Sequence, residues 1–375
     1  MTTRKLSRYM EIANELRQLI QNNATAAGDQ LPTETQLMKT YGVSRHTIRQ
    51  ALDQLAHENM LVRIPGKGTF TSQTSSLHEP AENLVAVIMT YISDYIFPSI
   101  VRGIEQRLRE SSYSMILLST QNRVDLERRA LQTALDQNCQ GIILEPTKST
   151  MPNQNLDIYD EICSRQLPVV LLHADPPGFP PFYKILFDDQ EGAYLLTEHL
   201  IMQGHKSIGG VFKIDDKQGL FRLKGFIAAL EHYHIPFDPT SIFLYSTESK
   251  GIAAQEYVRS MFAGKPQHAS GIVCYNDEIA IAVIKQLEAR GFHVPGQVSV
   301  VGFDDSPLAA LSHPELTTIR HPKEEMGKTA ASVLLNLISG TPPTPAQKMV
   351  FPAELIIRQS TKKLRIPEDI TSAPL

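Results

Sequence analysis

Hydrophobic and polar positions follow one rhythm before residue 72 and another after residue 83. In the first segment, apolar residues recur every three or four positions from Leu6 to Ile20, again around Leu37, and from Ile48 to Leu55. This spacing places the apolar side chains on one face of an α-helix. The pattern therefore predicts three short amphipathic helices that share one small core.

The polar residues between these helices predict where each helix begins and ends. Thr33 is followed three positions later by Gln36, which is the arrangement of a capping box at a helix start. Gly42 can take the left-handed backbone that ends a helix, and Ser44 can cap the next one. The segment therefore predicts a helix, a tight turn and a second helix.

Two short apolar runs follow the third helix. They cover residues 60–64 and 69–71, and the turn Pro65-Gly66-Lys67-Gly68 separates them. Glycines in such a turn allow the backbone to approach DNA closely. The runs predict a two-stranded wing, so we expect the first 72 residues to form an α+β winged helix-turn-helix domain.

The first turn of the third helix carries polar residues that the core does not need, namely Arg45, His46, Thr47 and Arg49. This part of a recognition helix meets base edges in the major groove, where Arg can bond guanine with two hydrogen bonds. The charge distribution agrees with DNA binding by this segment. Residues 1–72 carry nine Lys and Arg against six Asp and Glu, whereas the whole chain has a net charge of −4. A charged residue at a helix start, taken alone, is more often simply part of a solvated surface.

A polar stretch without periodicity, residues 73–83, is expected to be a flexible linker. Beyond it, strand-length apolar runs alternate with helical stretches, beginning with Leu84–Thr90 and Pro98–Glu110. The alternation restarts at Glu191–Gln203 and Ser207–Phe212. Repeated strand–helix units predict parallel sheets with helices on both faces, so we expect an α/β domain of two similar lobes.

In parallel sheets, ligands bind beyond the carboxyl ends of the strands. The residues found there are mostly carboxylates and amides, which suit a ligand rich in hydroxyl groups. Phe97 and Phe212 can stack on a sugar ring, while Asp188, Asp189 and Asp277 serve equally well as helix N-caps. The polar candidates at strand ends are Asp94, Tyr95, Glu145, His173, Asp175, Asp215, Asn276, Asp304 and Asp305.

Composition adds few constraints. The chain has 375 residues, which exceeds the size of one compact domain, and 42% of them are apolar. Cys139, Cys163 and Cys274 lack paired spacing, so neither a disulfide framework nor a metal site is expected. The N-terminus has no apolar block of the signal-peptide type, and no apolar run is long enough to span a bilayer. A cytoplasmic location is therefore expected.

Residues 31–70 resemble the winged helix of the GntR family of bacterial regulators, in the sequence LPTETQLMKTYGVSRHTIRQALDQLAHENMLVRIPGKGTF. The resemblance implies DNA contacts from the four polar residues at the start of the third helix. It also implies contacts from Gly66, Lys67 and Gly68 in the wing. For Lys5 and Glu34 it implies a contact with the DNA backbone or a role in positioning the arginines.

Residues 84–361 resemble the effector domain of the LacI/GalR repressors, through CYNDEIAIAV, VPGQVSVVGFDDSPLA and LTTIRHP. The resemblance implies a two-lobed fold like that of type I periplasmic binding proteins. It places on the ligand Arg222 of FRLKGF, Asn276 of CYND, and Asp304 with Asp305 of GFDD.

The same resemblance implies lobes that are discontinuous in sequence. The first is expected at about residues 84–188 and 321–345, and the second at about 189–318 and 347–361. Residues 362–375 are then a C-terminal tail. Chain crossings between the lobes make a hinge beside the cleft.

The joined modules resemble the arabinose repressors of Bacillus-like bacteria over nearly the whole chain, in LEPTKS, FKIDDKQG, CYNDEIA and AELIIRQS. The resemblance implies a homodimeric repressor of sugar-utilisation genes that binds double-stranded operator DNA and is released when L-arabinose binds. It implies no cofactor, no metal ion, no catalytic residue and no membrane contact.

Three alternatives remain open from the sequence. The effector can be another sugar or a small polar metabolite, the α/β domain can be an enzyme, or the protein can be a transport binding protein. No dinucleotide or Walker glycine loop, GxSxG, HExxH or Schiff-base lysine motif favours an enzyme. The missing signal peptide and the attached DNA-binding module oppose transport.

Overall fold

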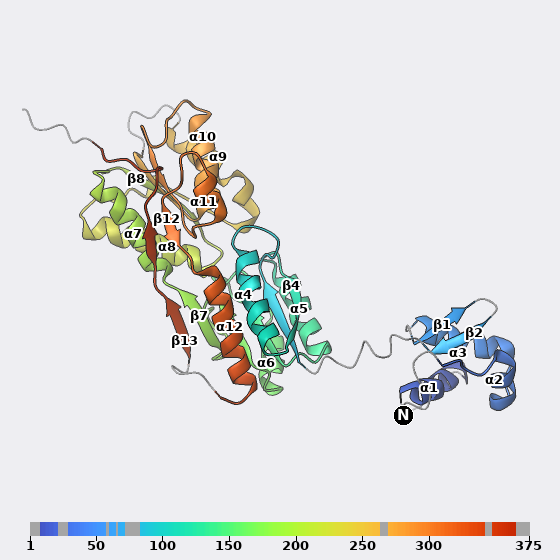
Figure 1. Cartoon of the computed structure of the whole chain (residues 1–375). Coiled ribbons are helices and arrows are strands. Elements are labelled where there is room, and N and C mark those ends of the chain that lie inside the picture. Colours follow the sequence, from blue (N-terminus) through green and yellow to red (C-terminus); the bar gives the residue numbers. More distant parts are fainter. Residues whose placement is uncertain are drawn as a thin grey trace, which may run out of the picture. The chain divides into compact units, whose positions relative to one another are not determined.

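The chain divides into two compact units, Met1–Glu82 and Asn83–Leu375 (Figure 1). This is a computed structural model, and it describes residues 8–21, 29–57, 60–64, 67–71, 83–262, 269–341 and 347–364. Nearly all of the expected linker, and the expected tail from residue 365 onward, lie outside the described residues. No helix in the described ranges is long and apolar enough to cross a membrane.

The N-terminal unit packs its helices and a two-stranded antiparallel sheet around one core. The sequence prediction of the helix ends is confirmed. The Thr33 hydroxyl accepts from the backbone N–H of Gln36, the Gln36 side chain accepts from the backbone N–H of Thr33, and Gly42 has a φ of 64°. The elements are α1 (Arg8–Gln21), α2 (Glu34–Tyr41), α3 (Arg45–His57), β1 (Leu61–Ile64) and β2 (Gly68–Thr71).

The C-terminal unit contains two parallel sheets, as the alternation of strands and helices predicts. The first sheet has the strand order β13-β7-β6-β5-β3-β4. Strands β5 and β6 are buried on both faces, which explains their continuous apolar runs. The elements of this first lobe are β3 (Leu84–Met89), α4 (Phe97–Glu110), β4 (Ser114–Ser119), α5 (Val124–Asp136), β5 (Gly141–Leu144), α6 (Leu156–Ser164), β6 (Val169–Leu172), β7 (Tyr183–Phe187), α12 (Lys323–Ile338) and β13 (Lys348–Phe351).

The second sheet has the order β11-β10-β8-β9, and β12 pairs with β14 in a separate antiparallel ribbon. The elements of this second lobe are α7 (Asp189–Met202), β8 (Ile208–Lys213), α8 (Lys217–His232), β9 (Ile242–Tyr245), α9 (Lys250–Phe262), β10 (Gly271–Cys274), α10 (Asp277–Glu288), β11 (Ser299–Val301), α11 (Pro307–Leu311), β12 (Thr318–Arg320) and β14 (Glu354–Ile356). Two short 3₁₀ turns, Pro239–Ser241 and Thr247–Ser249, flank β9.

The chain crosses between the lobes three times, at residues 187–189, 320–323 and 351–354. The expectation that residues 347–361 belong to the second lobe is wrong for its first part, because β13 pairs with β7 in the first sheet. Residues 348–351 are an exposed edge strand with only four residues, so no buried apolar run marked them in the sequence.

Each lobe contains a pair of helices that pack closely through glycine. In the first lobe α4 and α12 lie side by side (Figure 1), and a Cβ on Gly103 would lie 2.1 Å from the carbonyl oxygen of Glu324. In the second lobe α7 and α8 pack in the same way, with Gly225 against the carbonyl oxygen of Gln190. The side chains of α4 and α12 share one core cluster on the same face of the first sheet, so their close packing orders the helix ends that begin beside the cleft.

Candidate functional site

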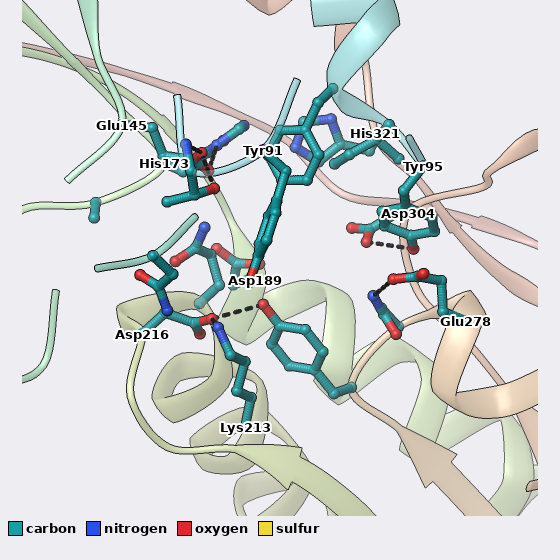
Figure 2. Close-up of a pocket in the computed structure, with 18 of the residues that line it drawn as sticks. Tyr91, Tyr95, Glu145, His173, Asp189, Lys213, Asp216, Glu278, Asp304 and His321 are labelled. Carbon is teal, nitrogen blue, oxygen red and sulfur yellow. Dashed lines mark hydrogen bonds and ion pairs between the residues drawn. The ribbon is translucent and has the colours of Figure 1, made fainter. Parts of the chain in front are cut away.

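A pocket lies in the C-terminal unit between the two lobes, at the carboxyl ends of strands from both sheets (Figure 2). Its cavity volume is about 100 Å³, which is several times the room that one water molecule needs. The position agrees with the rule for parallel sheets. The predicted residues that line this pocket are Asp94, Tyr95, Phe97, Glu145, His173, Arg222, Asn276 and Asp304.

Arg222 of α8 is buried in the pocket wall, and each nitrogen of its guanidinium group has a partner. Nε donates to Asp189 Oδ1 at 2.8 Å, and Nη2 donates to Asp304 Oδ1 at 3.1 Å. Nη1 donates to the carbonyl oxygen of Tyr275 at 2.6 Å, and the guanidinium lies 3.6 Å from the centre of the Phe303 ring. These bonds fix Arg222 within the second lobe, so two of its donors are taken by carboxylates and the third by a backbone carbonyl before any ligand binds.

The pKa values of this cluster follow from burial and from the ion pairs. Burial raises the pKa of Asp189 to about 6, although Arg222 pulls it down. Burial alone would lower the pKa of Arg222, but Asp304 and Asp189 raise it above its ordinary value. Arg222 therefore remains a cation, and its charge is compensated inside the protein.

Tyr95 joins the lobes directly. It precedes α4 in the first lobe, and its hydroxyl donates to Oδ2 of Asp304 in the second lobe at 2.6 Å. The same hydroxyl accepts from the backbone N–H of Asp277 at 3.2 Å. Burial raises the pKa of Tyr95 well above its ordinary value, and Asp304 adds to this shift. Tyr95 thus remains a neutral donor that can form these bonds only while the lobes are together.

The first lobe contributes a buried glutamate and histidine. Glu145 Oε2 accepts from the backbone N–H of Thr90 at 2.9 Å, and Oε1 lies 2.9 Å from Nδ1 of His173. Burial lowers the pKa of His173, but Glu145, together with Asp189 and Asp304, offsets this and the net shift is upward. Among the described residues, Nε2 of His173 and Nδ1 of His321 are buried without a hydrogen-bond partner. These two nitrogens offer hydrogen-bonding positions to a ligand.

The second lobe contributes charged residues that are also paired. Lys213 Nζ lies 2.8 Å from Asp216 Oδ2, which accepts from the Tyr275 hydroxyl at 2.8 Å. Lys250 pairs with Glu278 at 2.8 Å. Figure 2 shows Lys213 and Asp216 together on one side of the pocket and Glu278 on another. Every lysine and arginine in the pocket lining therefore has a carboxylate partner.

Four predicted residues do not line the pocket, namely Asp175, Phe212, Asp215 and Asp305. Asp175 pairs with Lys184, and Asp215 accepts from the backbone N–H of Thr247.

Phe212 is buried in the core, with its ring centre 5.4 Å from that of Phe226. Successive side chains of a strand point to opposite faces, and the next residue, Lys213, lines the pocket instead. Asp305 points away from the cavity and accepts from Arg358 Nη2 at 2.6 Å. The prediction of ligand contacts from Phe212 and Asp305 is therefore not supported by their positions.

Several lining residues were not predicted as ligand contacts. Lys213 was detectable as a charged residue directly after the apolar run GGVF, and His321 as a polar residue directly after LTTIR. Asn276, which was predicted as a ligand contact, has two roles. It caps α10 by accepting from the backbone N–H of Ile279, and it lines the pocket. The unpredicted polar residues of the lining include Tyr91, Asn122, Lys213, Asp216, Lys250, Tyr275, Glu278 and His321, whereas Asp189, named from the sequence as either a ligand contact or an N-cap, lines the pocket.

The backbone is left-handed at four of the pocket residues that carry hydrogen-bonding side chains. Tyr95, Asn122, His173 and Asp304 have φ values of 61°, 53°, 64° and 98°. Residues with a side chain rarely adopt such values, and each instance costs about 1–3 kcal/mol. Their convergence on one cavity marks it as a functional site.

The N-terminal unit presents the expected DNA-binding residues at the start of α3. Arg45, His46 and Arg49 are exposed, and Thr47 is half-buried. Glu34 of α2 accepts from Arg49 Nε at 3.0 Å and lies 3.6 Å from Arg45 Nε. A carboxylate between the two arginines fits the positioning role that the resemblance implied.

The wing is described only in part. Lys67 is exposed, and Gly68 has a φ of 123°, which favours glycine. Lys5 and Gly66 lie outside the described residues.

The comparisons with known proteins cover both units. Residues 8–71 match the model of bacterial regulatory proteins of the gntR family, and residues 197–361 match the periplasmic binding protein-like domain. The chain is 37% identical over 366 residues to an arabinose metabolism transcriptional repressor of Geobacillus stearothermophilus, covering 97% of this chain and all of the relative. A repressor of the same name from Halalkalibacterium halodurans is also 37% identical, over 96% of this chain and 98% of the relative.

A solved structure gives the same result for the fold. The transcription regulator CcpA of Lactococcus lactis superposes with a TM-score of 0.65 at 26% identity, covering 75% of this chain and 99% of that one.

Proposed function

The chain belongs to the family of the arabinose metabolism transcriptional repressors and is a DNA-binding, sugar-responsive repressor, and we propose that L-arabinose is its effector. The effector would bind in the pocket between the lobes. Its polar contacts would come from Asp94, Tyr95, Glu145, His173, Arg222, Asn276 and Asp304, with Phe97 against the ring. We propose binding and not catalysis as the role of this pocket.

One observation about charge carries the proposal of an uncharged sugar. The lining holds six carboxylates, of Asp94, Glu145, Asp189, Asp216, Glu278 and Asp304, and three cations, all of them paired. An anionic ligand would meet a surplus of negative charge and no free cation. Hydroxyl groups both donate and accept, so a neutral polyol suits carboxylates and unpartnered imidazole nitrogens. The pocket thus favours a free sugar over a phosphorylated or oxidised one.

For DNA binding, we propose that Arg45, His46, Thr47 and Arg49 contact the operator, with the wing from Gly66 to Gly68. Glu34 would hold the arginines, and Lys5 would contact the backbone. Two copies of the chain would present two winged helices to the half-sites of a roughly palindromic operator. Sugar and operator would oppose each other's binding, because each would favour a different arrangement of the dimer.

Calorimetric titration of the full-length protein tests the effector. L-Arabinose should bind, while D-xylose, D-galactose, ribose and the anion L-arabinonate should bind at least tenfold more weakly. L-Arabinose should also release a fluorescent operator duplex in an anisotropy assay. If L-arabinose gives no heat and no release, the effector assignment is wrong. If L-arabinonate binds as well as the sugar, the charge argument is wrong.

A further inference from the structure

The lobes touch a second time at the rim of the cleft, on the side opposite the hinge. The three chain crossings leave from β7 and β13, at one edge of the first sheet, and from β12 in the second lobe, which lies beside the end of β11 through a bridge between Val301 and Thr317. The second contact is made by segments that follow β4 and β5 in the first lobe, and β8 and β9 in the second. In the strand order β11-β10-β8-β9, strand β9 is the edge strand opposite β11. The pocket therefore lies between the hinge and this contact.

We define the rim contact by its four interactions. The Asn122 amide donates to Thr247 Oγ1 at 2.6 Å, and the Thr150 hydroxyl donates to the carbonyl oxygen of Ile214 at 2.8 Å. The backbone N–H of Lys217 donates to Ser149 Oγ at 2.9 Å.

The fourth interaction is an ion pair between Lys148 and Glu248. Lys148, together with a hydrogen bond from Ser246, lowers the pKa of Glu248 to about 2. Glu248 is largely exposed, so this pair is the weakest of the four. Asn122 also accepts from the backbone N–H of Lys148 at 2.8 Å and so orders the segment that carries the other partners.

Of the rim residues, only Asn122 lines the pocket. Ser149 and Asn122 are buried, whereas the remaining side chains lie at the surface between the lobes. The contact is thus made of polar groups that satisfy one another only when the lobes are together. When the lobes part, these groups return to water, so the contact contributes free energy to the closed arrangement alone.

We propose that the rim contact is a latch: Ser149, Thr150 and Thr247 are positioning residues that hold the lobes closed over the effector without touching it. The proposal rests on the proposed sugar-binding function of the pocket. A ligand that needs the closed arrangement binds with an apparent affinity proportional to the closed fraction. Loss of the latch therefore lowers the affinity for every sugar by the same factor and leaves the order of preference among sugars unchanged.

The test removes the hydroxyl and keeps the rest of each side chain, with a methyl in its place for threonine. In the full-length protein, each of Ser149→Ala, Thr150→Val and Thr247→Val should lower the affinity for L-arabinose about 2- to 12-fold by calorimetry. This range corresponds to the free energy of one neutral hydrogen bond. Thr133→Val is the matched control, since the Thr133 hydroxyl bonds only to Arg129 within α5, and it should bind like the unmodified protein. The affinity for D-galactose, or for any other sugar that binds measurably, should fall by the same factor.

A charge exchange gives an independent test. Lys148→Glu and Glu248→Lys should each lower the affinity for L-arabinose about 2- to 5-fold. The double variant, which restores the ion pair with the charges exchanged, should recover most of that affinity. An unchanged affinity in the combined Ser149→Ala and Thr150→Val variant would overturn the proposal. So would a loss that differs between sugars, because it would indicate a direct contact with the ligand.

Failure of the proposed function is distinguishable from failure of the latch. If the unmodified protein binds none of the sugars, the effector assignment fails, and hydrogen exchange of the sugar-free protein then tests the latch. In Thr150→Val combined with Thr247→Val, the backbone N–H of Lys217 should exchange faster than in Thr133→Val. Equal exchange in the two proteins would overturn the latch.

Discussion

Removal of the Tyr95 hydroxyl should weaken effector binding through the arrangement of the lobes. Tyr95→Phe keeps the ring and deletes only the oxygen that donates to Asp304 at 2.6 Å and accepts from the backbone N–H of Asp277 at 3.2 Å. Both partners belong to the second lobe, whereas Tyr95 belongs to the first. The lost bonds therefore stabilise the closed arrangement and have no counterpart when the lobes are apart, and loss of the effector contact proposed for Tyr95 would add to this effect.

The magnitude follows from the kind of bond that is lost. A hydrogen bond to a charged group contributes about 1.5–3 kcal/mol. Asp304 keeps its bond from Arg222 at 3.1 Å, so its carboxylate is not left unpaired, and the lower end of that range applies. At about 1.4 kcal/mol for each factor of ten, the affinity for L-arabinose should fall by at least tenfold.

Calorimetric titration with L-arabinose measures this change, and the chain offers a matched control. Tyr113→Phe removes a hydroxyl that donates to Gln140 at 3.2 Å within the first lobe. It should leave the affinity unchanged. The concentration of sugar that releases operator DNA should rise in Tyr95→Phe by the same factor as the dissociation constant.

Two results would refute this reasoning. If Tyr95→Phe binds L-arabinose within twofold of the unmodified protein, the bond across the cleft does not stabilise the liganded arrangement. If Tyr113→Phe weakens binding as much as Tyr95→Phe does, the loss reflects general destabilisation and not the closure of the lobes.

Three further predictions concern stability and DNA. Gly103→Ala should lower the free energy of unfolding by about 1–3 kcal/mol in urea, because its Cβ would meet the backbone of α12, whereas Gly251→Ala, which has open space, should not lower it. Burial, with Asp304 nearby, raises the pKa of Asp277 to about 7 from an ordinary value of about 3.9. The folded protein thus holds this proton more tightly, so the free energy of unfolding should fall as pH rises from about 4 to 7, and Asp277→Asn should flatten that slope in urea titrations at each pH. Arg49→Ala should weaken operator binding by about 1–3 kcal/mol in an anisotropy assay if the arginine bonds guanine, and an equal loss on random DNA would instead indicate a phosphate contact.

Local rules predicted the elements well because each rule depends on a few neighbouring residues. The capping box of Thr33 and Gln36 and the left-handed turn at Gly42 formed where the spacing placed them. The continuous apolar runs of β5 and β6 identified buried parallel strands in the same way. The short strand β13 was missed because its apolar run, Met349-Val350-Phe351, has only three residues and is mostly exposed.

The pocket was harder to predict because it depends on side-chain direction and on the meeting of distant segments. Asp304 and Asp305 are neighbours in sequence, yet Asp304 faces the pocket and Asp305 faces Arg358. In β8 no polar alternation indicates which face turns toward the cleft, so Phe212 was chosen although Lys213 lines it. Three crossings of the chain are needed before such residues share one wall, and no local pattern encodes that arrangement.

The left-handed backbone at Tyr95, His173 and Asp304 has a consequence for engineering. Glycine at these positions would relieve the unfavourable conformations, but it would also add freedom to the unfolded chain. The same change would remove the hydroxyl, imidazole and carboxylate whose buried partners are Asp304, Glu145 and Arg222. Relief of this strain is therefore not a route to a more heat-resistant domain. A selection for thermostability should find its gains elsewhere, at exposed positions such as Gly251.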